Sequence, residues 1–293
     1  MPEGHTLHRL ATDVRDRFAG RLVSVTSPQG RFADSARLVD QTELVAAESW
    51  GKHLFVEFAQ ERFVHVHLGL YGRFDLRDGA PPLPVGQVRM RIVSGAPRPS
   101  YGDLRGATAC ELLTADQREA VLGRLGPDPL REDADWTRAW GRVNRARAPI
   151  GALLMDQAVL AGVGNVYRAE VLFRHRMHPL RPGNTLRRGQ FESMWQDLVM
   201  LMREGVRTGR IDTVRHDHTP EAMGRDPRVD DHGGEVYVYR RTSMPCLLCG
   251  STIRTGELVG RNIFWCPKCQ PVFRSRAVRS ASNTPETSRG ARP

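Results

Sequence analysis

The sequence begins MPEGHTLHRLATDVRDRFAG (residues 1–20), and the rest of the chain is organised around this stretch. Its apolar residues recur at i, i+3, i+4, i+7 and i+11, the spacing of one face of an amphipathic helix, which Gly20 can end. They are Leu7, Leu10, Ala11, Val14 and Phe18. Removal of Met1 leaves Pro2 as a secondary amine, and an α-amino group titrates near pH ~7.7–8.0, so part of it is neutral at physiological pH. The stretch therefore predicts a packed helix that holds a nucleophilic amine in a fixed place.

Glu3 follows this amine directly, which places a carboxylate one residue from a potential nucleophile. A second interpretation is that Pro2 and Glu3 only favour the start of the helix, where proline fits the first turn and an acid suits the helix dipole. Both residue types are routine at helix starts, so the choice between the two interpretations depends on the rest of the chain.

The composition indicates a polyanionic partner. The chain has 293 residues, with 43 Lys and Arg against 33 Asp and Glu, a formal charge of +10 and a pI of about 10.1, and length alone predicts two or three domains. Nearly all of the basic residues are arginines, which bind phosphate in a fork and stack on bases. The alternative is a basic solvated surface without a specific partner. With no run of eighteen apolar residues and no signal-peptide pattern, we expect a cytoplasmic protein without a membrane segment.

Four of the five cysteines form two CxxC pairs near the C-terminus, Cys246 with Cys249 and Cys266 with Cys269. Two such pairs make a tetrahedral four-thiolate site, so we expect one structural zinc ion, with reduced free thiols as the alternative. Glycines between the pairs suit a β-hairpin whose tip carries Arg261. The fifth, Cys110, lies in a predicted strand as a small buried apolar residue.

Residues 22–113 show the alternation of half-buried antiparallel strands, for example Leu54, Val56 and Phe58 against Phe55 and Glu57. We expect a β-sandwich of two sheets that carries the N-terminal helix at its edge, as a catalytic domain over residues 1–125.

Gly126-Pro127-Asp128-Pro129 breaks the pattern and predicts a linker over residues 126–134, followed by an all-helical domain over 135–235. Within it, residues 161–167 form a tight turn before a helix start, whose N–H groups are either a phosphate site or an ordinary corner. A short strand is expected at 236–241, within a zinc-finger hairpin unit over 236–273, and a disordered basic tail at 274–293. Nucleotide-binding loops are absent from the sequence, which argues against a nucleotide cofactor.

Seven motifs, in order, resemble the formamidopyrimidine-DNA glycosylase and endonuclease VIII family, from Met1 to about Phe273. They are Pro2-Glu3-Gly4, Gly51-Lys52, His67-Leu68-Gly69-Leu70-Tyr71-Gly72, Arg124-Leu125-Gly126-Pro127, Met155-Asp156-Gln157, Gly162-Val163-Gly164-Asn165, and the zinc hairpin that closes in Gly260-Arg261 and Trp265-Cys266-Pro267-Lys268-Cys269-Gln270.

The resemblance implies an α+β protein with a β-sandwich, a helix-two-turn-helix domain, a zinc finger, and DNA between the domains. It implies a bifunctional reaction in which Pro2 attacks the sugar C1′ of a flipped nucleotide, Glu3 handles protons, and Lys52 acts as an acid or base. Lys52 is expected at the start of a strand. Without the resemblance, the alternative interpretation is an ordinary surface lysine. The resemblance assigns Arg261 to the phosphates and to the second elimination. It also gives a set of DNA-binding residues: Leu70 and Tyr71 as a wedge, Arg124, Gly162 and Asn165 on the phosphate side, and Tyr239.

Substrate signals in the sequence are mixed. His5 and Thr6 replace the second Pro-Glu found in many members of the family, and Thr6 removes a carboxylate from the pocket side of the helix. We expect base excision repair of damaged double-stranded DNA by a monomer, with oxidised pyrimidines favoured over 8-oxoguanine. The alternative is a non-catalytic protein that binds damaged DNA or DNA ends.

Overall fold

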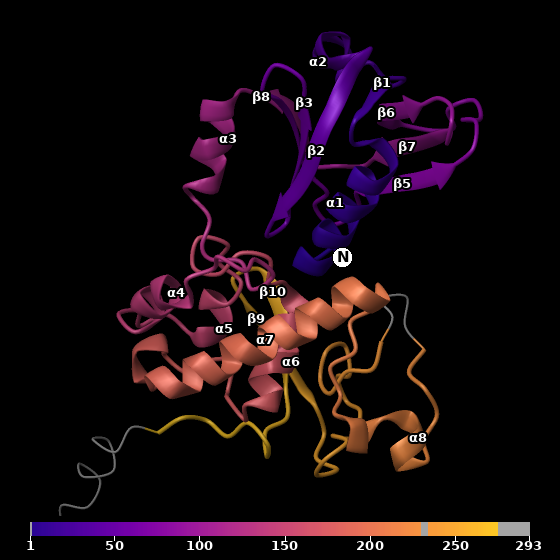
Figure 1. Ribbon diagram of the computed structural model, residues 1–293. Helices are drawn as coiled ribbons and strands as arrows, with labels where there is room; N and C mark the ends of the chain where they lie inside the picture. The colour runs from indigo at the N-terminus through magenta and orange to yellow at the C-terminus, as the bar shows by residue number, and fades with distance from the viewer. Residues whose placement is uncertain (1, 230–233, 275–293) are drawn as a thin grey trace, which may run out of the picture.

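The computed structural model describes residues 2–229 and 234–274, and the chain forms two halves (Figure 1). The first half holds the N-terminal helix and eight strands. Its elements are α1 (Gly4–Phe18), β1 (Arg21–Thr26), α2 (Ala33–Val39), β2 (Thr42–Trp50), β3 (His53–Phe58), β4 (Arg62–His67), β5 (Arg73–Asp78), β6 (Val88–Ser94), β7 (Ser100–Arg105), β8 (Ala109–Leu113) and α3 (Ala115–Leu122). The predicted apolar stripe of α1 is buried as expected, and α1 packs mainly on β2.

Antiparallel pairing joins all eight strands in the order β5-β7-β6-β1-β2-β3-β4-β8. The expectation of two separate sheets therefore needs correction, because β1 pairs with both β2 and β6 and connects the two halves of the sheet. The β1–β2 pairing is only three residue pairs long. Apolar residues from both halves, such as Val64 of β4 and Met90 of β6, contribute to one buried core, so the sheet still encloses a sandwich-like interior. Two helices were missed: α2 lies within residues 22–113, which were predicted as strands, and α3 follows that region.

The second half is helical and ends in a two-stranded hairpin. Its elements are α4 (Trp136–Val143), α5 (Ile150–Leu153), α6 (Asn165–Arg174), the 3-10 turn η1 (Gly183–Thr185), α7 (Arg188–Thr208), the 3-10 turn η2 (His216–His218), α8 (Pro220–Met223), β9 (Arg254–Leu258) and β10 (Arg261–Trp265). Asp135 caps α4 through a 2.9 Å hydrogen bond from the Thr137 N–H. Buried side chains of α4, α6 and α7 share one core with the hairpin.

Three expectations for this half and for the linker before it have different outcomes. Residues 236–241 form no strand; this segment is irregular and buried except at Arg240, because the N–H groups of Tyr237, Val238 and Tyr239 bond to the Glu170 carboxylate instead of to a neighbouring strand. The predicted disordered tail lies outside the described residues except for Arg274. The expected linker has no regular structure, yet residues 126–130 are buried between the two halves.

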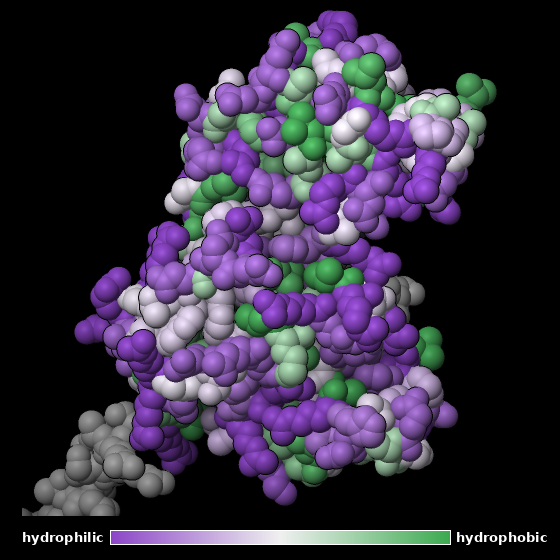
Figure 2. Space-filling view, viewed as in Figure 1, coloured by the Kyte–Doolittle hydropathy of each residue, from purple (hydrophilic) through white to green (hydrophobic). Residues whose placement is uncertain are grey.

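The side of the molecule in Figure 2 is mostly polar and narrows between the two halves. The start of α1 lies at this narrowing (Figure 1). Among the helices that the structure describes, none has the length and apolar character needed to cross a membrane.

Candidate active site

Glu3 joins the two halves of the molecule through its side chain. The carboxylate is fully buried, and it does not cap its own helix. It accepts hydrogen bonds from the first N–H groups of α6 instead: Gly164 N at 2.9 Å, Val166 N at 2.8 Å and Tyr167 N at 3.4 Å. An anion at a helix N-terminus is stabilised by the N–H groups and the helix dipole. The interpretation that Glu3 only supports the start of α1 is therefore wrong.

Backbone contacts hold the neighbouring residues equally closely. The Gly4 N–H donates to the Gly162 carbonyl at 2.8 Å. A Cβ on Gly4 would lie 2.9 Å from the Gly162 Cα, and a Cβ on Gly164 would lie 2.4 Å from the Glu3 Cδ. Glycine is therefore required at both positions for a steric reason, since neither has a positive φ.

The turn between β2 and β3 brings Lys52 to the same junction. Gly51 and Lys52 form this two-residue turn, so Lys52 precedes the strand rather than beginning it as predicted. Gly51 has φ +59°, and a Cβ there would lie 2.9 Å from Gly162 N. Its N–H donates to the buried Asp128 carboxylate at 2.7 Å, and the Trp50 indole donates to the Gly126 carbonyl at 3.1 Å.

Electrostatics at this junction favour acid–base chemistry. Burial lowers the pKa of Lys52, and the nearby Arg261 and Arg168 lower it further, whereas Glu3 raises it. Burial raises the pKa of Glu3, while Lys52 and the three N–H donors stabilise its anion. A lysine with a lowered pKa and a buried carboxylate beside it are the residue types that move protons in active sites.

The turn before α6 was expected to be either a phosphate site or an ordinary corner. Two of its N–H groups are bonded within the protein, because Glu3 accepts from Gly164 and the Gln157 amide oxygen accepts from Gly162 at 2.9 Å. The Asn165 side chain donates to the Asn262 carbonyl of the hairpin at 3.1 Å and accepts from Arg168. This turn positions Glu3 and the hairpin.

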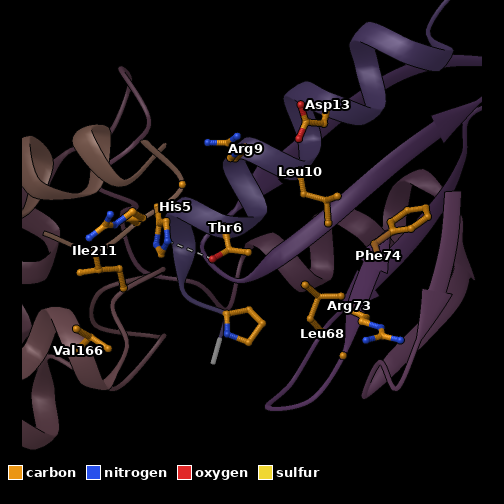
Figure 3. A pocket seen from close by; sticks show the side chains of 14 residues that line it. His5, Thr6, Arg9, Leu10, Asp13, Leu68, Arg73, Phe74, Val166 and Ile211 are labelled. Carbon is orange, nitrogen blue, oxygen red and sulfur yellow. Dashed lines mark hydrogen bonds between the residues drawn. The ribbon is translucent and has the colours of Figure 1, made fainter. Parts of the chain in front are cut away.

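A cavity of about 420 Å³ opens beside Pro2, between α1, the start of β5 and the segment after α7 (Figure 3). His5, Thr6 and Arg9 of α1 line one side, and Leu68 and Arg73 line another. Burial lowers the pKa of His5 to about 4, helped by cationic neighbours, so its imidazole is neutral at physiological pH. The cavity thus offers both polar and apolar surface next to the N-terminal amine.

A second cavity of about 490 Å³ gathers most of the predicted DNA-binding residues. Its lining residues are Leu70, Tyr71, Asn165, Tyr239, Arg240, Gly260, Arg261, Asn262 and Phe264. Tyr71 is 89 % exposed in the turn after β4, as a wedge requires, whereas Tyr239 is only 3 % exposed and packs edge-on against Phe264. Arg124 is exposed but lies elsewhere, near His53. Neither Gly162 nor Lys52 lines this cavity.

The four C-terminal cysteines fit a zinc ion. All four sulfur atoms lie within 4.8 Å of one another, with 3.9 Å between Cys246 and Cys269 and 3.5 Å between Cys249 and Cys266. Tetrahedral coordination with Zn–S bonds of about 2.3 Å requires sulfur atoms about 3.8 Å apart. The cluster can therefore hold one ion, and it leaves no open position for chemistry. Its role is to fix the hairpin that carries Arg261.

Three residues of the junction were missed. Asp128 and Gln157 both lie in motifs that the sequence showed, but only the structure reveals that they brace Gly51 and Gly162. Arg168 is 1 % exposed and bonds to the Asn262 carbonyl at 3.0 Å. Helical periodicity alone does not distinguish this buried arginine of α6 from an arginine on the surface.

Comparison with known proteins agrees with this geometry. Residues 1–110 match the formamidopyrimidine-DNA glycosylase N-terminal domain, and residues 125–216 match the formamidopyrimidine-DNA glycosylase H2TH domain. In structure, the chain is similar to the Lactococcus lactis Fpg bound to abasic-site DNA, with a TM-score of 0.74 and 21% identity over 92% of this chain and 100% of that one. Similarity to the MutM (Fpg) protein of Thermus thermophilus gives a TM-score of 0.69 at 24% identity, over 92% of this chain and 98% of that one. The fold is that of the helix-two-turn-helix DNA glycosylases.

Two curated relatives narrow this class. "Endonuclease 8 1" of Mycobacterium tuberculosis is 54% identical over 92% of this chain and 100% of its own length. A "Formamidopyrimidine-DNA glycosylase" of Gloeobacter violaceus is 31% identical over 92% of this chain and 96% of its own length. The chain belongs to the formamidopyrimidine-DNA glycosylase and endonuclease VIII family.

Proposed function

We propose that the protein is a base-excision repair DNA glycosylase with AP lyase activity that works through the amine of Pro2. The observation that carries this proposal is the junction between the two halves. There the chain terminus, the buried Glu3 carboxylate and a lysine with a lowered pKa meet beside a cavity of about 420 Å³. A flipped nucleotide has a place beside the amine in this arrangement.

The reaction follows from these groups. The lone pair of the Pro2 nitrogen attacks C1′, the bond from C1′ to the base breaks, and the base leaves with that electron pair and takes up a proton. The Pro2 nitrogen then loses its proton and the C1′–O4′ bond opens, with a proton taken up at O4′, which gives the iminium. The iminium acidifies the C2′ hydrogen, whose removal expels the 3′ phosphate. Lys52 supplies or accepts protons in these steps, and Arg261 assists the second elimination. Water then hydrolyses the remaining link to the protein.

We assign oxidised pyrimidines as the favoured substrates. Thr6 lines the cavity beside Pro2, so that side of the cavity carries a hydroxyl instead of a carboxylate. The relative at 54% identity bears the name "Endonuclease 8 1", which supports the same branch of the family. A monomer in the cytoplasm, associated with the nucleoid, suits this function, because one enzyme acts on one lesion.

The test is an excision assay on duplexes that carry an abasic site, an oxidised pyrimidine, a ring-opened purine or 8-oxoguanine. We expect strand cleavage first at the abasic site and the oxidised pyrimidine, and poor cleavage at 8-oxoguanine. Rapid excision of 8-oxoguanine opposite cytosine would overturn the substrate assignment. Tight binding to all four duplexes without cleavage would favour the second candidate, a non-catalytic protein that binds damaged DNA or DNA ends.

A further inference from the structure

A chain of titratable side chains crosses the outer face of the sheet, away from the apolar core. His53 and Phe55 of β3 lie on this face, and the strand register places them opposite His67 and His65 of β4. His65 in turn lies opposite Glu111 of β8. The intervening Leu54, Val64 and Val66 point into the core instead, as the alternation of a strand requires.

Two hydrogen bonds connect this chain from end to end. The Glu111 carboxylate lies 2.9 Å from the His65 Nδ1, and the His65 Nε2 lies 2.8 Å from the His53 Nδ1. Phe55 lies beside His65 with 5.1 Å between ring centroids, and the planes of the hydrogen-bonded His53 and His65 rings are only 14° apart. This near-coplanar arrangement keeps both imidazoles in line with the carboxylate.

The open end of the chain is the His53 Nε2. The His53 ring is partly exposed, and this nitrogen has no partner among the residues that the structure describes and is not among their buried unpartnered atoms. Solvent therefore reaches it. His53 directly follows Lys52, and Arg124 also lies near it. These cationic neighbours favour a negatively charged ligand.

We propose that Glu111, His65 and His53 form a phosphate site for the DNA backbone that takes up a proton when the phosphate binds. This proposal rests on the proposed function, since it takes DNA as the ligand. In the free protein the Glu111 carboxylate accepts Nδ1–H from His65, and the His65 Nε2 accepts Nδ1–H from His53, so the His53 Nε2 carries only a lone pair.

A phosphate oxygen cannot bond to that lone pair. One proton from solvent resolves the conflict: His53 gains Nε2–H and donates it to the phosphate, and the added positive charge is shared along the relay toward Glu111. Each hydrogen bond of the relay is kept, and the bound state holds one proton more than the free state. The ligand, the relay and the carboxylate then alternate in charge.

The charged groups that face the relay agree with a neutral free state. Burial lowers the pKa of His53 to about 3, together with His65, His67, Arg124 and Lys52, so His53 is uncharged before DNA binds. The helix α3 covers the same face with Arg118, which lies over the Phe55 ring at 5.7 Å and pairs with Glu48 of β2. Glu48 and Glu111 are both committed to other partners, so a phosphate can supply the counter-charge for a protonated His53.

The test is calorimetric titration of the full-length protein with a duplex that contains a stable abasic-site analogue. It is run at pH 6.5 in two buffers with different heats of ionisation, and the difference in binding heat gives the protons taken up. We expect net uptake by the wild type, and a clear loss of uptake for His53→Gln and for the milder Glu111→Gln, whose carboxylate is half-exposed. His216→Gln, an exposed histidine on the 3-10 turn η2, serves as the matched control and should behave as wild type.

Salt dependence gives a second readout. The slope of log affinity against log salt should be steeper by about one at pH 6 than at pH 8 for the wild type, the difference that one phosphate contact makes, and it should not change with pH for His53→Gln. Equal proton uptake by wild type, His53→Gln and Glu111→Gln, with normal DNA binding, would overturn the relay and leave the proposed function standing. Failure of the wild type to bind the duplex would instead count against the proposed function.

Discussion

Replacing Gly164 by alanine is a sharp test of how the Glu3 carboxylate is positioned. Gly164 has φ −117° and ψ −160°, an extended conformation that alanine adopts without strain. The added Cβ would lie 2.4 Å from the Glu3 Cδ and 2.6 Å from its Cγ and Oε1, whereas ordinary contacts are 3.4–4 Å. The carboxylate must therefore move by about 1 Å, and the cause is steric alone.

The expected losses follow from that displacement. Bonds of 2.8 and 2.9 Å from Val166 and Gly164 become too long to hold. Two hydrogen bonds to a buried charge correspond to about 3 kcal/mol in the free energy of unfolding, at about 1.5 kcal/mol each. A catalytic group displaced by about 1 Å can cost about 100-fold in rate, and we expect base excision to fall by about this factor.

The assays are single-turnover base excision on an oxidised-pyrimidine duplex and chemical denaturation of the free protein. Gly189→Ala is the matched control, because a Cβ there meets nothing within 4 Å and alanine favours the helix α7. It should leave the excision rate unchanged and stability equal or slightly higher. A Gly164→Ala protein that excises bases at the wild-type rate would refute the role of Glu3 described here.

Three further predictions concern other parts of the structure. Cys249→Ser should release zinc and weaken DNA binding while the β-sheet half keeps its circular dichroism and its unfolding transition; full DNA binding by a zinc-free protein, shown by metal analysis, would contradict this. Lys52→Ala should slow excision of a damaged base by about 100-fold but slow cleavage at a ready-made abasic site less, and equal losses in the two assays would reduce Lys52 to a phosphate contact. Burial raises the pKa of Asp197, but hydrogen bonds from His175 and Arg174 outweigh it and hold the pKa at about 2, so the carboxylate contributes stability above pH ~3.8 that is lost as the pH falls towards 2. Asp197→Asn should therefore lose about 2 kcal/mol of stability at pH 7 and show a flatter fall in acid, as measured by denaturation at several pH values; an unchanged acid profile would argue against the ion pair with Arg174.

The sequence predicted well what depends on local pattern. The apolar face of α1 and the two CxxC pairs are periodic or fixed in spacing, and both appear in the structure as expected. The alternation of strands was equally clear. Whether they form one sheet or two depends on the short β1–β2 pairing, which cannot be predicted from the residues of either strand. The helix α3, which follows the predicted strands, carries little amphipathic pattern, so it was not predicted.

Contacts between distant segments could not be predicted from local sequence patterns. Glu3 is 161 residues from Gly164 in the chain, and nothing local shows that its carboxylate caps another helix. The same limit explains the segment 236–241, which alternates like a strand but wraps its N–H groups around Glu170. In both places a buried carboxylate from a distant segment satisfies N–H groups that have no backbone partner.

The measurement that tests the central claim most directly is borohydride trapping of the protein on abasic DNA during turnover. An iminium between Pro2 and C1′ is reduced to a stable amine, so the protein with a verified Pro2 terminus should become covalently linked to the DNA strand. Protein that keeps Met1 or carries one extra N-terminal residue should bind the same DNA and give little or no adduct. A strong adduct from the blocked terminus, or none from the verified Pro2 protein, would contradict catalysis by this amine.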